Sequence, residues 1–304
     1  MKQSRGRRSR ASWVGATSLL TATIAASLLV GCGGSTVKAN GKIQVVAAFY
    51  PLAEAARWVG GDLISVKDLT PPGAEPHDLE LTPNQVDAIR DAALAVVTGG
   101  EFQPSVEDAA RQRSGPTLIA LKSPGITGRD SHFWLDPRKM SMVVNATAVA
   151  LAKVNPKNSD IYKQRASIAK KRLATLDLEM SNGLANCDRR VIVTAHDAFD
   201  RLGARYGIRV ESIAGFSPEE DPNPRRIAEL ADLVKKDGVT VIFTEDLVSP
   251  RVAEVLAREV GIGTEVLSPI EGLSAKASAR GDDYFSLMRS NLSQLVRALG
   301  CVSR

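Results

Sequence analysis

Short apolar runs alternate with longer amphipathic segments along most of this chain. The short runs predict strands at 45–49, 65–70, 94–98 and 117–121, then at 191–195, 208–213, 239–244 and 264–267. The segments between them carry helical periodicity or helix start signals. They predict a helix that begins at 82 and helices at 51–59, 103–111, 138–154, 198–206, 225–236, 249–260 and 282–299. Strands separated by helices pair in parallel. The pattern therefore predicts an α/β fold with two lobes, each a mainly parallel four-stranded sheet flanked by helices.

One segment between the two halves has a different pattern. Residues 159–184 contain no proline, and their apolar residues are spread among many charges. This predicts one long, partly exposed helix, which at about 26 residues would span roughly 39 Å. We interpret it as a rigid backbone helix between an N-terminal lobe at 44–156 and a C-terminal lobe at 187–304, with the linking helix within 157–186.

The first 31 residues form a separate segment. Five basic residues occur within the first ten positions, residues 11–30 are mostly small and apolar, and Cys32 follows. This arrangement resembles the lipobox of a bacterial lipoprotein signal peptide, in which the cysteine is lipidated and becomes the new N-terminus. Residues 32–43 would then form a flexible tether. The alternative is a transmembrane anchor with an incidental cysteine, since the apolar stretch is long enough for one.

Removal of this segment changes the charge of the protein. The whole chain has 39 Lys and Arg against 34 Asp and Glu, and the segment holds five of the basic residues and no acid, which leaves 34 against 34. A neutral mature protein gives no reason to expect a nucleic-acid partner.

Two cysteines remain if Cys32 carries lipid. An exported protein can form disulfides, so we expect a bond between Cys187 and Cys301 that ties the two ends of the second lobe. The alternative is a pair of unrelated buried thiols.

The three histidines of the chain all follow predicted strands. His77, His132 and His196 lie in loops at or beyond the C-terminal end of a strand, which is where ligands collect in open α/β sheets. One such histidine is more often a hydrogen-bonding residue than a ligand. Because imidazole is the commonest metal ligand in proteins, three together predict a metal site in the cleft between the lobes.

The motifs around these histidines resemble the zinc- and manganese-binding solute-binding proteins of ABC importers. The resemblance covers about residues 44–301 and rests on Pro76-His77-Asp78, His132-Phe133-Trp134-Leu135-Asp136-Pro137, Thr194-Ala195-His196-Asp197-Ala198-Phe199 and Phe243-Thr244-Glu245. It implies two α/β lobes joined by a long helix, with a metal bound in the cleft by the three histidines. It also implies a membrane permease and its ATPase as partners.

The fourth metal ligand is where the chain departs from the family. The resemblance implies a carboxylate just after the last strand, and we align that position with Ser268. A hydroxyl is a poor ligand, so we expect water or a carboxylate that reaches in, with Glu245 as the first candidate and Glu271 as the second. Three nitrogens with at most one oxygen suit tetrahedral Zn²⁺, whereas Mn²⁺ favours more oxygen ligands. We therefore expect zinc in preference to manganese.

These observations favour a binding protein over an enzyme. We expect a monomer outside the cytoplasm, anchored to the membrane by lipid on Cys32, that captures the metal and delivers it to an ABC importer. One alternative is a zinc-dependent hydrolase or hydratase with a three-histidine site. Against it, Asp78, Asp130 and Asp197 are equally well explained as partners that orient the imidazoles. A metal-binding surface adhesin is the other alternative.

Overall fold

We describe residues 41–127, 131–220 and 223–302 in a computed structural model of the chain. The predicted signal peptide, Cys32, Asp130 and nearly all of the tether lie outside these residues. Across the described ranges, no helix combines the length and the apolar composition needed to cross a membrane.

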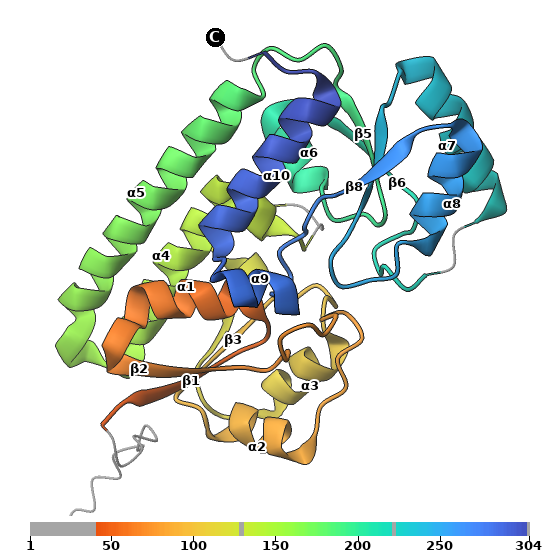
Figure 1. Ribbon diagram of the computed structural model, residues 1–304. Helices are drawn as coiled ribbons and strands as arrows, with labels where there is room; N and C mark the ends of the chain where they lie inside the picture. The colour runs from red at the N-terminus through yellow and green to blue at the C-terminus, as the bar shows by residue number, and fades with distance from the viewer. Residues whose placement is uncertain (1–40, 128–130, 221–222, 303–304) are drawn as a thin grey trace, which may run out of the picture. The chain divides into compact units, whose positions relative to one another are not determined.

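The first sheet consists of four parallel strands in the order β2-β1-β3-β4. These strands are β1 (Ile43–Ala47), β2 (Ile64–Asp68), β3 (Leu94–Val97) and β4 (Thr117–Ile119). Helices α1 (Tyr50–Gly60) and α4 (Pro137–Val154) cover one face, and α2 (Pro83–Asp91) and α3 (Pro104–Gln112) cover the other (Figure 1). Because both faces are covered, the central strand β3 is apolar and buried at every position.

The second sheet repeats this arrangement in the order β6-β5-β7-β8, again with all strands parallel. Its strands are β5 (Val191–Thr194), β6 (Arg209–Ser212), β7 (Val241–Thr244) and β8 (Gly263–Val266). The helices in this half of the chain are α6 (Asp200–Tyr206), α7 (Pro224–Asp237), α8 (Arg251–Val260), α9 (Ala275–Arg280) and α10 (Tyr284–Leu299). The predicted α/β class with two four-stranded parallel sheets is confirmed.

Local start signals place several helices where the sequence predicts them. Thr82 and Gln85 form a reciprocal capping box at the start of α2, and Pro83 occupies the first helical position, where its missing N–H is harmless. The Asp136 carboxylate accepts the backbone N–H of Arg138 at the start of α4. Short α9 is the helix that the sequence analysis missed.

Helix α5 (Ser159–Gly183) is the single long helix predicted between the two sheets. Its buried residues recur every three or four positions and form one stripe, which faces α4, α1 and α10. These residues are Tyr162, Ala166, Ala169, Leu173, Leu176 and Met180. Ile161, Ile168 and Leu178 are largely exposed on the rest of its surface. The lobe boundaries given above stay a prediction, because one continuous apolar core includes residues of both halves.

The disulfide expected between Cys187 and Cys301 is present. The two cysteines lie opposite each other in an isolated antiparallel bridge, just before β5 and just after α10. The bond therefore joins the two ends of the second half of the chain.

Candidate metal centre

Five titratable side chains of interest follow five different strands. His77, His132, His196, Glu245 and Glu271 come after β2, β4, β5, β7 and β8 respectively. In parallel sheets the carboxyl ends of the strands share one edge, so this placement gathers the side chains at the facing edges of the two sheets. All five are buried.

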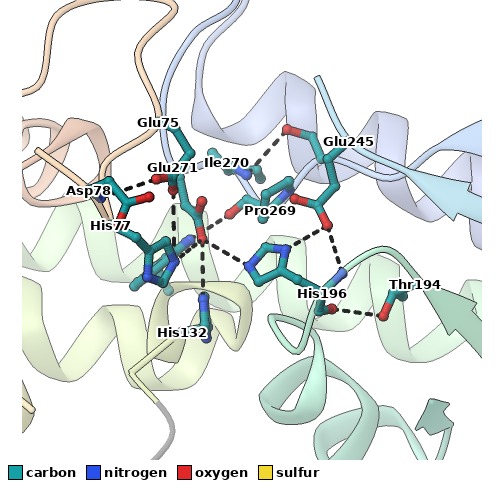
Figure 2. A network of polar contacts seen from close by, with 12 residues as sticks. Glu75, His77, Asp78, His132, Thr194, His196, Glu245, Pro269, Ile270 and Glu271 are labelled. Atoms are coloured by element: carbon teal, nitrogen blue, oxygen red, sulfur yellow. Dashed lines mark hydrogen bonds and ion pairs between the residues drawn. The ribbon is translucent and has the colours of Figure 1, made fainter. Parts of the chain in front are cut away.

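The three histidines converge on Glu271. The Glu271 Oε1 atom lies 3.2 Å from Nε2 of His132, 3.5 Å from Nε2 of His77 and 3.7 Å from Nε2 of His196. One candidate ligand atom from each of these four residues lies within 4.8 Å of the other three. Figure 2 shows the Glu271 carboxylate among the imidazole rings. The geometry therefore brings together all three predicted histidines and the second-ranked carboxylate.

Glu245, the first-ranked carboxylate, lies on the opposite side of the His196 ring (Figure 2). Its Oε1 atom is 2.6 Å from His196 Nδ1 and also accepts the backbone N–H of His196 at 3.2 Å. A hydrogen bond to Nδ1 fixes the tautomer and leaves Nε2 directed at the other ligand atoms. The geometry thus reverses the order in which the sequence ranked the two carboxylates.

Ser268 is not part of this group of side chains. Its hydroxyl accepts the N–H of Ile270, and its backbone N–H and C=O both pair with the Asn291 amide. The carboxylate that follows the last strand is instead Glu271, three residues further on. This agrees with the expectation that a carboxylate from elsewhere reaches the histidines in place of Ser268, whereas the alignment of Ser268 with the family's fourth-ligand position stays a prediction.

The turn before Glu271 explains why the sequence ranked this residue only second among the carboxylates. Ile270 has a φ of 57°, in the left-handed region that β-branched residues rarely adopt. The Trp134 indole N–H donates to the carbonyl of Pro269 at 2.7 Å, and Tyr284 in turn donates to the carbonyl of Trp134. These tertiary contacts hold the segment in place, and no local sequence signal for such a turn exists at an isoleucine.

Aromatic rings enclose the imidazoles. Phe102 lies 4.3 Å from the His77 ring, and Trp134 lies 5.2 Å from the His132 ring, between ring centroids. Both aromatic side chains are fully buried. An apolar shell of this kind excludes water and strengthens electrostatic interactions inside it.

The charges of the buried groups depend on one another. Burial by itself would raise the pKa of Glu271, but the neighbouring imidazoles of His132, His196 and His77 hold the pKa well below its usual range. Burial would lower the pKa of His196, but the Glu245 and Glu271 carboxylates raise this pKa to about 10. Burial, followed by the charge of Glu271, raises the pKa of the nearby Glu75 carboxyl to about 7. Without a metal, the centre therefore holds an anionic Glu271 and a protonated His196, and His196 must lose a proton before its Nε2 atom can bind a cation.

The donor set has the chemistry of a tetrahedral Zn²⁺ site. Three imidazole nitrogens and one carboxylate oxygen match the ligand types and number that zinc takes in proteins. The Nε2 atoms of His77 and His196 and the Oε1 atom of Glu271 make no hydrogen bond to any part of the chain that the structure describes. Buried polar atoms without such a bond are costly, and a bound cation would satisfy them.

Comparison with protein families gives a match over residues 45–298 to ZnuA, described as the periplasmic component A of a zinc-uptake complex. The chain belongs to this family. The ZnuA family is one of metal-binding transport proteins, not of enzymes. The hydrolase alternative therefore has no support from it.

Individual relatives agree with the family. The high-affinity zinc uptake system protein ZnuA of Bacillus subtilis is 30% identical over 301 residues, which cover 90% of this chain and 94% of that protein. The zinc-binding protein AdcA of Streptococcus pyogenes is 31% identical over 290 residues, which cover 85% of this chain. This chain spans only 56% of the length of that AdcA.

The fold also matches solved structures of ZnuA-like proteins. The crystal structure of the Zn(II)-bound ZnuA-like domain of Streptococcus pneumoniae AdcA has a TM-score of 0.74 and 31% identity, over 85% of this chain and 99% of that one. The two-sheet arrangement described above is therefore the arrangement of this family.

Proposed function

We propose that this chain captures a zinc ion outside the cytoplasm and delivers it, as transported substrate, to an ABC importer. The observation that carries the proposal is the convergence of His77, His132, His196 and Glu271, which are all buried and each bring one candidate ligand atom within 4.8 Å of the other three. The zinc-uptake description of the family supports it.

In this proposal His77, His132, His196 and Glu271 are the four ligands. Glu245 is a positioning residue, because it holds Nδ1 of His196 and so directs Nε2 at the metal. One carboxylate and three imidazoles favour zinc over manganese for two reasons. Manganese prefers more oxygen ligands, and its intrinsic affinity for a given site is lower than that of zinc.

The partners and the location follow from the same proposal. A periplasmic component of an uptake complex needs a permease and an ATPase to move the metal across the membrane, and these are the partners we infer. The lipobox-like sequence ending at Cys32 supports a lipid anchor and a location outside the cytoplasm.

Zinc titration of the purified protein tests the proposal. We expect one zinc ion per chain and displacement of manganese by zinc in competition. Replacement His132→Ala should weaken zinc binding by orders of magnitude because it removes one of four ligands. Asp246→Asn is the matched control, since Asp246 is exposed and adjacent to Glu245. Unchanged affinity in His132→Ala, or manganese outcompeting zinc in the wild type, would overturn the proposal.

A further inference from the structure

The four proposed ligands lie at different depths below the surface. The side chains of His132 and His196 are 0% exposed, that of Glu271 is 2% exposed and that of His77 is 3% exposed. Exposure rises further at Glu75, whose side chain is 12% exposed and whose Oε1 atom lies 4.0 Å from His77 Nε2. Of the four proposed ligands, His77 therefore has the most exposed side chain, and the more exposed Glu75 lies next to it.

Two phenylalanines flank His77, and they differ in exposure. Phe102 lies 4.3 Å from the His77 ring and is fully buried, so it closes the inner side. Phe216 meets the same ring edge-on at 4.9 Å and lies 5.4 Å from the His132 ring, but it is only partly buried. Phe216 thus contacts both the imidazoles and the solvent, and it covers the outer side of the centre.

Phe216 reaches the imidazoles from the other half of the chain. It lies in the loop after β6, whereas His77 and His132 follow strands of the first sheet. The backbone just before it is fixed, because Ala214 donates to the carbonyl of Ala195 at 2.8 Å and Gly215 accepts from Asp197 at 3.0 Å. The ring itself is held by aromatic contacts, which are individually weak. The backbone next to Phe216 is therefore held by hydrogen bonds, whereas the ring is held only by packing against the imidazoles and the apolar core.

We propose that Phe216 limits the rate at which the metal enters and leaves the centre past His77. This inference rests on the proposed function. The ring lies outside the set of metal-binding atoms, so its removal opens the path without removing a ligand. A group that blocks the path in this way changes association and dissociation equally and leaves the equilibrium affinity unchanged.

Rapid-mixing kinetics with a fluorescent zinc chelator test this inference. Zinc-loaded protein is mixed with excess chelator to give the dissociation rate, and zinc is mixed with the metal-free protein to give the association rate. We expect Phe216→Ala to raise both rates about tenfold, since two weak ring contacts with the histidines are lost. The larger side chain in Phe216→Leu should give an intermediate increase.

Matched controls separate this role from simple destabilisation. Ile227 is a half-buried apolar residue of α7 that packs on the separate apolar cluster of the second sheet, so Ile227→Ala should leave both rates unchanged. Unchanged rates in Phe216→Ala would overturn the inference. The inference would also be overturned if Phe216→Ala speeds dissociation alone and so weakens the affinity, because Phe216 would then hold the metal ligands in position. If the wild type binds no zinc, the proposed function itself fails, and the titration shows this independently.

Discussion

Two carboxylates approach the His196 ring, one at each ring nitrogen, and their chemical environments differ. Glu245 contacts Nδ1 at 2.6 Å and belongs to the same half of the chain as His196. Glu271 approaches Nε2 of His196 and also Nε2 of the two histidines from the first half. A metal held at Nε2 would therefore bind Glu271 directly, and it would feel Glu245 only through the imidazole.

This difference predicts unequal effects of two otherwise identical substitutions. Glu245→Gln should weaken zinc binding by about 10-fold to 100-fold, as is typical when a partner of a ligating histidine is lost. Glu271→Gln should weaken it by more than that, because it removes the only anionic ligand. Competition titrations of both variants against one chelator measure the ratio. A larger loss in Glu245→Gln than in Glu271→Gln would contradict the assignment.

Among single residues, the sequence predicted that the three histidines come together, but it ranked Glu271 only second among the carboxylates. Each histidine is part of a recognisable motif in the loop after a predicted strand, so its position along the chain indicates its place in the fold. Glu271 depends on the left-handed turn at Ile270 and on the hydrogen bond from Trp134, which joins residues 135 positions apart. Such long-range contacts leave no local pattern in the sequence.

Elements were more predictable than single residues, because hydrophobic periodicity and caps are local. All eight strands and the long helix α5 lie within a few residues of their predicted positions. The exception, α9, has six residues and only one that is buried, so it carries no apolar period. Its cap, the Ser274 hydroxyl that accepts from Ala277, is by itself too common a signal to identify a helix.

The disulfide acts at the level of elements, because it joins the entry to β5 to the end of α10. It closes a loop of 114 residues, for which chain entropy sets an upper limit of about 4.7 kcal/mol of stabilisation. We expect the double replacement Cys187→Ser with Cys301→Ser to lower the free energy of unfolding by about 2–4 kcal/mol in denaturant titrations.

Zinc affinity should stay unchanged in the same variant. Cys187 precedes β5 and His196 follows it, so the bond and the centre lie at opposite ends of that strand. Thiol labelling of the unreduced wild type provides the control, and it should find neither of these two cysteines reactive. Equal unfolding free energies, or full labelling of both thiols, would refute this role of the bond.

Across the residues that the structure describes, helix α5 contacts both halves of the chain along its length. On one side the Arg165 guanidinium donates to the carbonyl of Gly60 and to Asp62. On the other, Arg205 binds Asp177 through two hydrogen bonds, and Arg289 binds Glu179 in the same way. Exposed ion pairs are individually weak, but the buried apolar stripe of α5 lies between them. The helix is therefore fixed at both ends as well as along its length.

A helix held in this way resists bending between the two sheets. We expect zinc uptake and release to involve local shifts of loops and side chains such as Phe216, and not a wide hinge closure. Small-angle scattering of the metal-free and zinc-loaded protein should therefore give closely similar profiles and radii of gyration. Titration of the same samples confirms that they differ in zinc content. A clear decrease in the radius of gyration on zinc binding would mean that α5 does bend, and that the two halves close on the metal as rigid bodies.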